Sequence, residues 1–436
     1  MTNSAQHPNR NCISSFRPAT AALAMAIAFG LTVGATQSVH AQTFRVLHAF
    51  TGGTDGSTPY GVGITMDAAG NLYGGASYGG LGTQGCEYQG SCGVVYRMSR
   101  KGSGWIFNTL YEFTGTDGEQ PDAPLVFGPD GAIYSTTYYG GSYSCIDGGC
   151  GVVYSLRPPP TSCKSAYCPW TETVLHQFVA DGDGLRPAFG VLVFDKSSNI
   201  YGTTTVGGQD PPYAGIVFEL TRSGGQWSLN VLHSFTEQSD GGYPWSGLVF
   251  DSAGNLYGTT TGGGDNGGGT AFQMTPSGDS WTLTTIYPFS PNTDGYSAMC
   301  NLLLDSSGNL WGTTRYGGAS GAGTAFELSP SGGSWNFNLL YSFPGSRRGS
   351  QTALIMDKQG NLYGTTVEGG KYGSGGVFKL TPSEYGWIYT SLHDFSGAED
   401  GYGPMGQIVM DGNGNLYGTA SGGGAYKYGT IWEITP

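Results

Sequence analysis

The sequence predicts an all-β fold, a seven-bladed β-propeller with four antiparallel strands in each blade, on three observations. Residues 251–260, Asp-Ser-Ala-Gly-Asn-Leu-Tyr-Gly-Thr-Thr, are one of seven related segments that recur every 52 to 67 residues, a period typical of repeat folds. Glycine supplies 78 of the 436 residues and aromatic residues 13%, which favours short strands and tight turns over helices. The two chain ends carry complementary parts of one repeat. The central aromatic residues of the seven segments are Tyr73, Tyr134, Tyr201, Tyr257, Trp311, Tyr363 and Tyr417.

One repeat shows the plan of a blade. Residues 247–251 form a short apolar first strand, and in the turn that follows Gly254 and Asn255 are able to take the positive φ angles that a tight hairpin needs. The second, third and fourth strands are expected over residues 255–261, 269–275 and 281–289. Their β-branched and aromatic residues, partly alternating with period two, are typical of strands. Four antiparallel strands per repeat are one propeller blade.

The chain ends predict how the ring closes. Residues 43–50 have the pattern of a fourth strand without a preceding blade, and residues 429–436 have that of a third strand without a following fourth. We therefore expect the N-terminal strand to join the last blade, which closes the ring and removes its open edges. An open solenoid would not need this arrangement.

The first 41 residues are typical of a secretory signal peptide. Arg10 and Arg17 precede an uncharged apolar run over residues 21–33, and small residues follow before Gln42. The alternative is a membrane anchor, but the run is short for a bilayer span. We expect cleavage, a secreted or periplasmic location, one propeller over residues 42–436 and no membrane span after cleavage. A net charge of −13 argues against nucleic acid and anionic membranes as partners.

Six cysteines occur as close pairs in extended loops: Cys86 and Cys92, Cys145 and Cys150, Cys163 and Cys168. Without a Cys-x-x-Cys motif or a nearby histidine, they indicate disulfides rather than zinc. The first four lie in loops that join second to third strands, on one face of the ring, so they can pair within one loop or between neighbouring loops. Cys163 lies on the opposite face and can pair only with Cys168. Cys300 is left over and is expected to be buried.

The string Gly-Asn-Leu-Tyr-Gly-Thr-Thr, two residues, Gly-Gly and then Gly-Thr-Ala/Val-Phe-Glu-Leu resembles the GloVer tandem repeat of secreted bacterial proteins. It is plainest over residues 254–274, 308–328 and 360–380, and repeats one and two depart from it at Gly75-Ala76 and Ser135. The resemblance implies an extracellular or surface protein and specifies no activity. The Asp-x-x-Gly-Asn-Leu-Tyr core is also similar to repeats of NHL, gluconolactonase-like and quinoprotein-like propellers, and the paired glycines are similar to those of kelch repeats.

Candidate ligand-binding residues lie in the loops that join the fourth strand of one blade to the first strand of the next, here called the entry loops. Aspartate precedes glycine in six of them, at Asp55, Asp117, Asp181 or Asp183, Asp240, Asp294 and Asp400, and aromatic residues follow, among them Tyr243, Trp245 and Tyr402. Carboxylates beside flat rings suit sugar hydroxyls and ring faces. Alternatively, aspartate caps a turn that glycine permits. In the sixth loop, Arg347 and Arg348 would add positive charge that can anchor an anionic group.

Other chemistry is not indicated. His48, His176, His233 and His393 share one repeat position with Tyr111, Tyr287 and Tyr341, which predicts aromatic packing between blades rather than a metal or catalytic cluster. Gly75–Gly79 matches a nucleophile-elbow pattern but no helix is expected after it. Residues 181–184 lack the remaining ligands of a calcium loop. We expect no catalytic residue, no metal and no cofactor.

These patterns favour a secreted or periplasmic binding module that recognises carbohydrate, or else another protein, through loops on one face. One alternative is a propeller enzyme of the lactonase, lyase or glycosidase kind at the channel mouth, and we consider it less favoured because no convergent, symmetry-breaking polar cluster is visible. Another is a structural surface protein. We expect a monomer. A functional site should lie where the repeats differ, at the cysteine-containing loops or at Arg347-Arg348.

Overall fold

The computed structural model describes residues 42–81, 86, 90–142, 145, 148–159, 170–180, 182–187, 189–209, 211–278, 280–345 and 348–436. Gln42–Pro436 forms one compact unit. The expected signal peptide lies outside the described residues, and so do Cys163, Cys168, Asp181 and Arg347.

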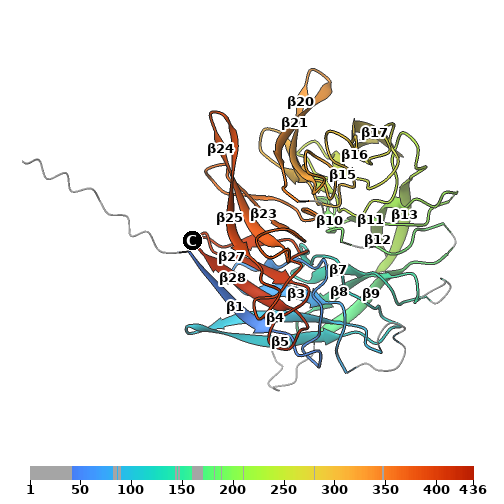
Figure 1. Ribbon diagram of the computed structural model, residues 1–436. Helices are drawn as coiled ribbons and strands as arrows, with labels where there is room; N and C mark the ends of the chain where they lie inside the picture. Colours follow the sequence, from blue (N-terminus) through green and yellow to red (C-terminus); the bar gives the residue numbers. More distant parts are fainter. Residues whose placement is uncertain are drawn as a thin grey trace, which may run out of the picture. The chain divides into compact units, whose positions relative to one another are not determined.

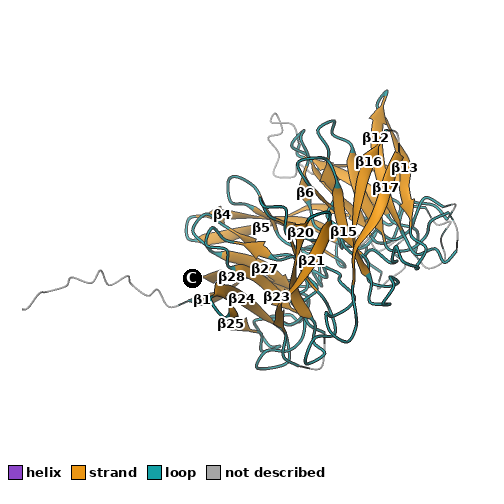
Figure 2. Cartoon of the chain, turned by 90° about the horizontal axis from the view of Figure 1, so that it is seen from above, coloured by secondary structure: helices purple, strands orange, loops and turns teal. Residues whose placement is uncertain are grey.

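Seven separate four-stranded antiparallel sheets make up the described chain (Figure 1). The described residues contain strands and loops but no helix (Figure 2). The predicted all-β, seven-bladed propeller with four antiparallel strands per blade is confirmed.

The two inner strands of each blade are the shortest. The first strands are β2 (Thr65–Met66), β6 (Val126–Phe127), β10 (Val193–Phe194), β14 (Val249–Phe250), β18 (Leu303–Leu304), β22 (Ile355–Met356) and β26 (Val409–Met410). The second strands are β3 (Leu72–Ala76), β7 (Ile133–Thr137), β11 (Ile200–Thr204), β15 (Leu256–Thr259), β19 (Leu310–Thr313), β23 (Leu362–Thr366) and β27 (Leu416–Ala420). The first strand is shorter than predicted.

The two outer strands are longer and match the predicted segments to within two residues. The third strands are β4 (Val94–Lys101), β8 (Val152–Arg157), β12 (Ile216–Ser223), β16 (Thr270–Ser277), β20 (Thr324–Ser331), β24 (Gly376–Ser383) and β28 (Thr430–Thr435). The fourth strands are β5 (Gly104–Glu112), β9 (Thr171–Gln177), β13 (Gln226–Ser234), β17 (Ser280–Pro288), β21 (Ser334–Ser342), β25 (Gly386–Asp394) and β1 (Thr43–Ala49).

The N-terminal strand completes the last blade, as predicted. β1 pairs antiparallel with β28, from Thr43 opposite Thr435 to Ala49 opposite Thr430, and the sheet order is β1-β28-β27-β26. In Figure 1 the blue β1 lies beside the red β28. This pairing covers the edge of β28, which would otherwise be free to pair with another chain.

The hydrophobic core lies between adjacent sheets. The phenylalanine that follows each fourth strand packs against an aromatic residue of the third strand in the next blade, as Phe289 does against Phe326 with ring centroids 5.1 Å apart. Six of the second strands have a glycine after the central aromatic residue, and this glycine makes room for such a ring, whereas β7 has Ser135 there. A Cβ at Gly258 would lie 2.6 Å from Cζ of Phe272. Glycine therefore recurs after the central tyrosine because this packing leaves no space for a side chain.

The repeated segment is held by its aspartate. The Asp251 carboxylate accepts hydrogen bonds from the backbone N–H groups of Ala253 and Asn255 at 2.9 Å, from Asn255 Nδ2 at 2.7 Å and from the Tyr257 hydroxyl at 3.1 Å. Gly254 has the expected positive φ of 90°, but Asn255 does not. The side chain of Asn255 serves as a donor to Asp251.

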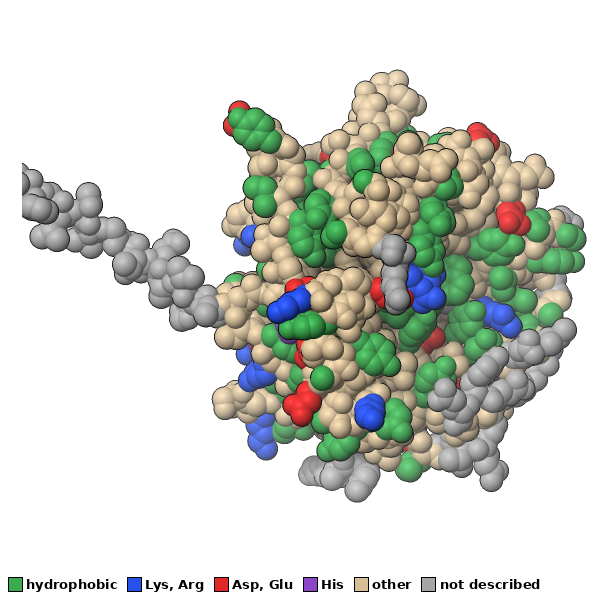
Figure 3. Space-filling model, in the orientation of Figure 1, with side chains coloured by type: hydrophobic (Ala, Val, Ile, Leu, Met, Phe, Trp, Pro, Cys, Tyr) green, Lys and Arg blue, Asp and Glu red, His purple; other side chains and the backbone are tan. Residues whose placement is uncertain are grey.

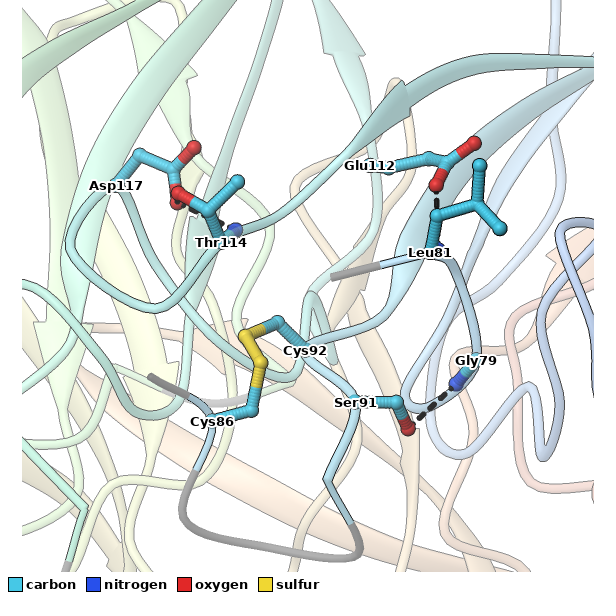
Figure 4. Close-up of a disulfide and its surroundings, with 8 residues drawn as sticks. All are labelled: Gly79, Leu81, Cys86, Ser91, Cys92, Glu112, Thr114 and Asp117. Carbon is cyan, nitrogen blue, oxygen red and sulfur yellow. Dashed lines mark hydrogen bonds between the residues drawn. A yellow bond between two sulfur atoms is a disulfide. The ribbon is translucent and has the colours of Figure 1, made fainter. Parts of the chain in front are cut away.

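Two disulfides close the extended loops of the first two blades. Cys86 pairs with Cys92, and Cys145 pairs with Cys150. Each disulfide therefore joins two residues of the same loop. Near the first disulfide, Gly79 N–H donates to Ser91 Oγ at 2.9 Å (Figure 4). Cys300 is buried and is the free cysteine of the described chain.

Candidate functional site

The entry loops and the loops between second and third strands lie on one face. Isolated bridges join the two kinds of loop in six blades: Ser57 with Tyr78, Glu119 with Tyr139, Leu185 with Val206, Gly242 with Gly262, Tyr296 with Tyr316, and Tyr402 with Gly422. The repeated segment also holds the entry loops in place. Thr259 Oγ1 donates to the carbonyl of Ala298 in the next entry loop at 2.9 Å. Equivalent bonds are made by Thr136, Thr203, Thr313, Thr365 and Thr419, at 2.7 to 3.3 Å.

The entry-loop aspartates bond to their own blade. Asp240 accepts a hydrogen bond from the Thr236 backbone at 3.0 Å and pairs with Nε2 of His233 at 3.0 Å. In the other loops Asp55, Asp183 and Asp400 pair with His48, His176 and His393 at 2.9 to 3.1 Å, and Asp117 and Asp294 accept from the hydroxyls of Tyr111 and Tyr287 at 2.6 and 2.7 Å. Asp117 also accepts from Thr114 (Figure 4). These contacts are the ones expected when an aspartate caps a turn, which was the alternative to sugar binding.

Two of the four histidines stack on a ring of the next blade, as predicted for this repeat position. His48 stacks on Phe107 of the next blade with ring centroids 4.2 Å apart, and His393 stacks on Phe44 at 3.7 Å. Burial lowers the pKa of His393 more than its hydrogen bond to Asp400 raises it. No group of three or more His, Cys, Asp or Glu side chains suited to a metal ion occurs within the described ranges.

The predicted aromatic residues occupy different parts of the face. Trp245 lines a central cavity, whereas Tyr243 lines a separate groove with Leu185 and Tyr213. The Tyr243 hydroxyl donates to Glu237 at 3.2 Å. Tyr402 is 48% exposed and lines neither that groove nor the cavity. The structure therefore does not bring these three rings together.

The central cavity, here called the mouth, receives side chains from the entry loops of all seven blades and has a volume of about 90 Å³. In five entry loops, a residue shortly before those that line the mouth has a left-handed backbone conformation. The φ angles are 53° to 58° at Thr58, Gln120, Arg186, Tyr243 and Ser297. Because this conformation recurs from blade to blade, it belongs to the scaffold. The side chains that it leads to differ, and they give the mouth two unlike sides.

One side of the mouth is aromatic. Phe189 and Trp245 stack with ring centroids 5.3 Å apart and an interplanar angle of 22°. Tyr60 approaches Phe189 from another blade, with centroids 5.8 Å apart. Gly61 is required for this contact, because a Cβ there would lie 1.9 Å from Cε1 of Phe189. The three rings also border a groove of about 420 Å³.

A buried carboxyl group lines this groove. Asp122 accepts a hydrogen bond from Ser77 Oγ at 2.6 Å, and the side chains of Tyr78, Tyr138 and Gln120 line the same space. Burial raises the pKa of Asp122 to about 7, despite the opposing hydrogen bond from Ser77. A carboxyl group with this pKa exchanges its proton near neutral pH.

The other side of the mouth is polar. Arg315, Gln351 and Asn301 line it. Nη1 of Arg315 lies 3.3 Å from Sδ of Met299, and its guanidinium lies 4.9 Å from the centroid of the Tyr316 ring. Burial first, and then the neighbouring charge of Arg348, lower the pKa of Arg315.

Of the two arginines predicted in the sixth entry loop, Arg348 is described, and its Nε lies 3.9 Å from Glu368. Sequence reasoning did not assign a role to Phe189, Asp122, Arg315 or Gln351. The signal that could have found Asp122 and Gln351 is divergence, because Asp122, Trp245, Met299 and Gln351 each lie four residues before the first strand of a blade. Arg315 follows a Thr-Thr pair where other repeats have small or uncharged residues.

Charged side chains are few on the visible face and are scattered among apolar and uncharged ones (Figure 3). Within the part of the chain that the structure describes, no helix is long and apolar enough to cross a membrane.

The fold is therefore that of a seven-bladed propeller, and the entry loops of all seven blades contribute residues to its mouth. Residues 147–353 and 333–436 match the Gloeobacter/Verrucomicrobia repeat, and the chain belongs to this repeat family. No curated protein sequence matches it.

Solved structures that are similar to the chain include the following two. A protein of unknown function from Dyadobacter fermentans has a TM-score of 0.44 at 11% identity, covering 80% of this chain and 96% of its own. A gluconolactonase from Xanthomonas campestris has a TM-score of 0.37 at 12% identity, covering 72% of this chain and 98% of its own.

Proposed function

We propose that this protein is a secreted or periplasmic binding module that recognises carbohydrate at the mouth of the propeller. The observation that carries the proposal is the wall formed by Tyr60, Phe189 and Trp245, which faces polar side chains across the mouth. Flat aromatic rings stack on the apolar faces of sugars, and amide and hydroxyl groups bind sugar hydroxyls. The adjoining groove of about 420 Å³ is within the size range of small-molecule sites.

The proposed location has separate support. Two intrachain disulfides are typical of proteins from an oxidising compartment, and the N-terminal sequence is that of a signal peptide.

In this proposal the predicted residues divide into two groups. Trp245 contacts the ligand directly. Tyr243 and Tyr402 lie outside the mouth on entry loops, so they would contact only a ligand long enough to extend outward. The carboxylates of Asp55, Asp117, Asp240, Asp294 and Asp400 shape the loops, because each already bonds within its own blade.

Glycan-array screening followed by titration calorimetry of a disaccharide from the best hit tests the proposal. Trp245→Ala should weaken binding by roughly 10- to 100-fold, since a stacked aromatic contact contributes about 1.5–3 kcal/mol when it is buried. Tyr402→Ala is the matched control and should change disaccharide binding less than about twofold. Absence of binding to any glycan would refute the carbohydrate assignment.

A second candidate, an enzyme acting at the same groove, is favoured by one observation. Asp122 is a buried carboxyl group with a pKa of about 7, a value suited to general acid–base catalysis. If the protein degrades the glycan that it binds, new reducing ends will accumulate and Asp122→Asn will abolish them while binding persists. If the glycan stays intact after prolonged incubation, the enzyme candidate is rejected and the binding module is the function that remains.

A further inference from the structure

Two side chains at the polar side of the mouth contain buried nitrogen donors without a protein partner. These donors are Nε of Arg315 and Nε2 of Gln351, and both side chains line the central cavity. A buried donor without a partner costs about 1–3 kcal/mol. Two such donors at one cavity indicate a site whose acceptors come from a ligand.

The charge of Arg315 is also uncompensated at close range. Among the described residues, no acidic side chain lies within 4.0 Å of its guanidinium, which contacts the weak acceptor Sδ of Met299 and the ring of Tyr316. The carboxylate of Glu368 acts on Arg315 from a greater distance and lies 3.9 Å from Nε of Arg348. The mouth therefore holds a partly buried positive charge in a protein whose net charge is −13.

The size of the cavity limits the group that can enter it. A volume of about 90 Å³ holds roughly three water molecules, which is close to the space needed by a planar carboxylate. Arginine and amide donors together suit the two oxygens of such a group. The aromatic wall beside the cavity would hold the ring to which the carboxylate is attached.

We propose that the ligand is an acidic sugar, a uronic acid residue, whose carboxylate enters the mouth and binds Arg315 and Gln351 while its ring packs on Trp245 and Phe189. This inference rests on the carbohydrate function proposed above and adds the class of sugar. Asp122 lies in the adjoining groove, where it faces the rest of the glycan rather than the carboxylate.

The experiment compares trigalacturonate with its methyl ester, in which a methyl group neutralises each carboxylate, by titration calorimetry of the purified protein. The acid should bind roughly 10- to 100-fold more tightly than the ester, as expected for charge-assisted hydrogen bonds in a partly buried site. The preference should decrease as salt is added.

Variants separate the two proposals. Arg315→Gln should remove the preference for the acid and leave ester binding within about twofold, whereas Trp245→Ala should weaken both probes. Gln351→Ala is a second, smaller change and should reduce the preference several-fold. Arg222→Gln is the matched control, because it removes an equal charge near the end of β12, where the guanidinium packs over Trp227, and it should retain the preference.

Each result has a distinct meaning. Equal binding of acid and ester by the unmodified protein overturns the acidic-sugar inference but leaves carbohydrate binding intact. Tighter binding of a sulfated trisaccharide, or of inorganic phosphate alone, overturns the carboxylate as the recognised group. Binding of neither probe, together with an empty glycan array, overturns both proposals.

Discussion

At the scale of single residues, one carboxylate holds the same turn in blade after blade. Asp251 accepts four hydrogen bonds from a segment of six residues, and Asp67, Asp305, Asp357 and Asp411 do the same in their own blades. Burial raises the pKa of Asp251, but the bonds from Asn255, Tyr257 and Ala253 lower it more, so its net pKa lies below 3.8. The ionised form is therefore the one that supports the turn.

Asp251→Ala should lower the free energy of unfolding by roughly 2–4 kcal/mol, because it leaves the Asn255 amide and the Tyr257 hydroxyl without their acceptor. Urea denaturation measures the change. Asp265→Ala, at an exposed loop position, is the control and should stay within about 0.5 kcal/mol. Equal stability of the two variants would contradict the structural role given to Asp251.

Asp122 should make the protein less stable as the pH rises through neutrality. Its pKa is raised from 3.8 to about 7, so the folded chain binds the proton more tightly than the unfolded chain does. The stability that this group contributes is present in full below pH 3.8 and is lost as the pH rises through about 7.

Asp122→Asn should therefore be more stable than the unmodified protein at pH 8, by roughly 2–4 kcal/mol, and similar to it near pH 4. Ser77 can still donate to the amide oxygen. Urea denaturation at both pH values checks this, with Asp265→Asn as the control. A constant difference between the variants at the two pH values would show that the carboxyl group ionises normally in the fold.

The residues of the scaffold could be read from the sequence, whereas those of the mouth, apart from Trp245, could not. The scaffold aspartate, glycine and tyrosine recur, so their roles are visible as a pattern. Asp122 and Arg315 each occur once, and only the convergence of loops from different blades shows that they border one space. The entry-loop aspartates were open to two interpretations because capping a turn and binding a sugar use the same residue type.

At the scale of elements, β1 joins the two ends of the ring. Phe44 stacks on His393 and approaches Trp432, and Arg45 pairs with Glu433 at 2.5 Å. This element could be predicted because the N-terminus has a fourth strand without a blade and the C-terminus has a blade without a fourth strand. Pairing the two completes the blade. The pairing of the four cysteines in the two extended loops could not be predicted, because both loops lie on one face and the cysteines could pair within a loop or between loops. These cysteines are Cys86, Cys92, Cys145 and Cys150.

A chain that begins at Phe50, and so lacks β1, should expose the edge of β28 together with the side chains that β1 covers. We expect aggregation, or an apparent melting temperature at least about 5 °C lower than that of a chain that begins at Gln42. Scanning calorimetry and size-exclusion chromatography provide the comparison. A soluble, monomeric product with unchanged melting would show that the ring does not depend on β1.

At the scale of the whole molecule, the residues that recur from blade to blade support the loops, and the residues that differ between blades line the proposed binding site. Thr259 and its equivalents bond six of the seven blades to the entry loop of the next, so the segment that recurs most faithfully fixes the loops that differ most. Those loops converge on one mouth, where three rings face an arginine and a glutamine. A rigid, symmetric scaffold thereby presents an asymmetric binding site.

A crystal structure of the protein with trigalacturonate tests this account most directly. It predicts a sugar ring packed on Trp245 and Phe189, with a carboxylate in the mouth within hydrogen-bonding distance of Arg315 and Gln351. A sugar bound instead at the outer entry-loop aspartates, or a mouth that holds only water at saturating ligand, would contradict it.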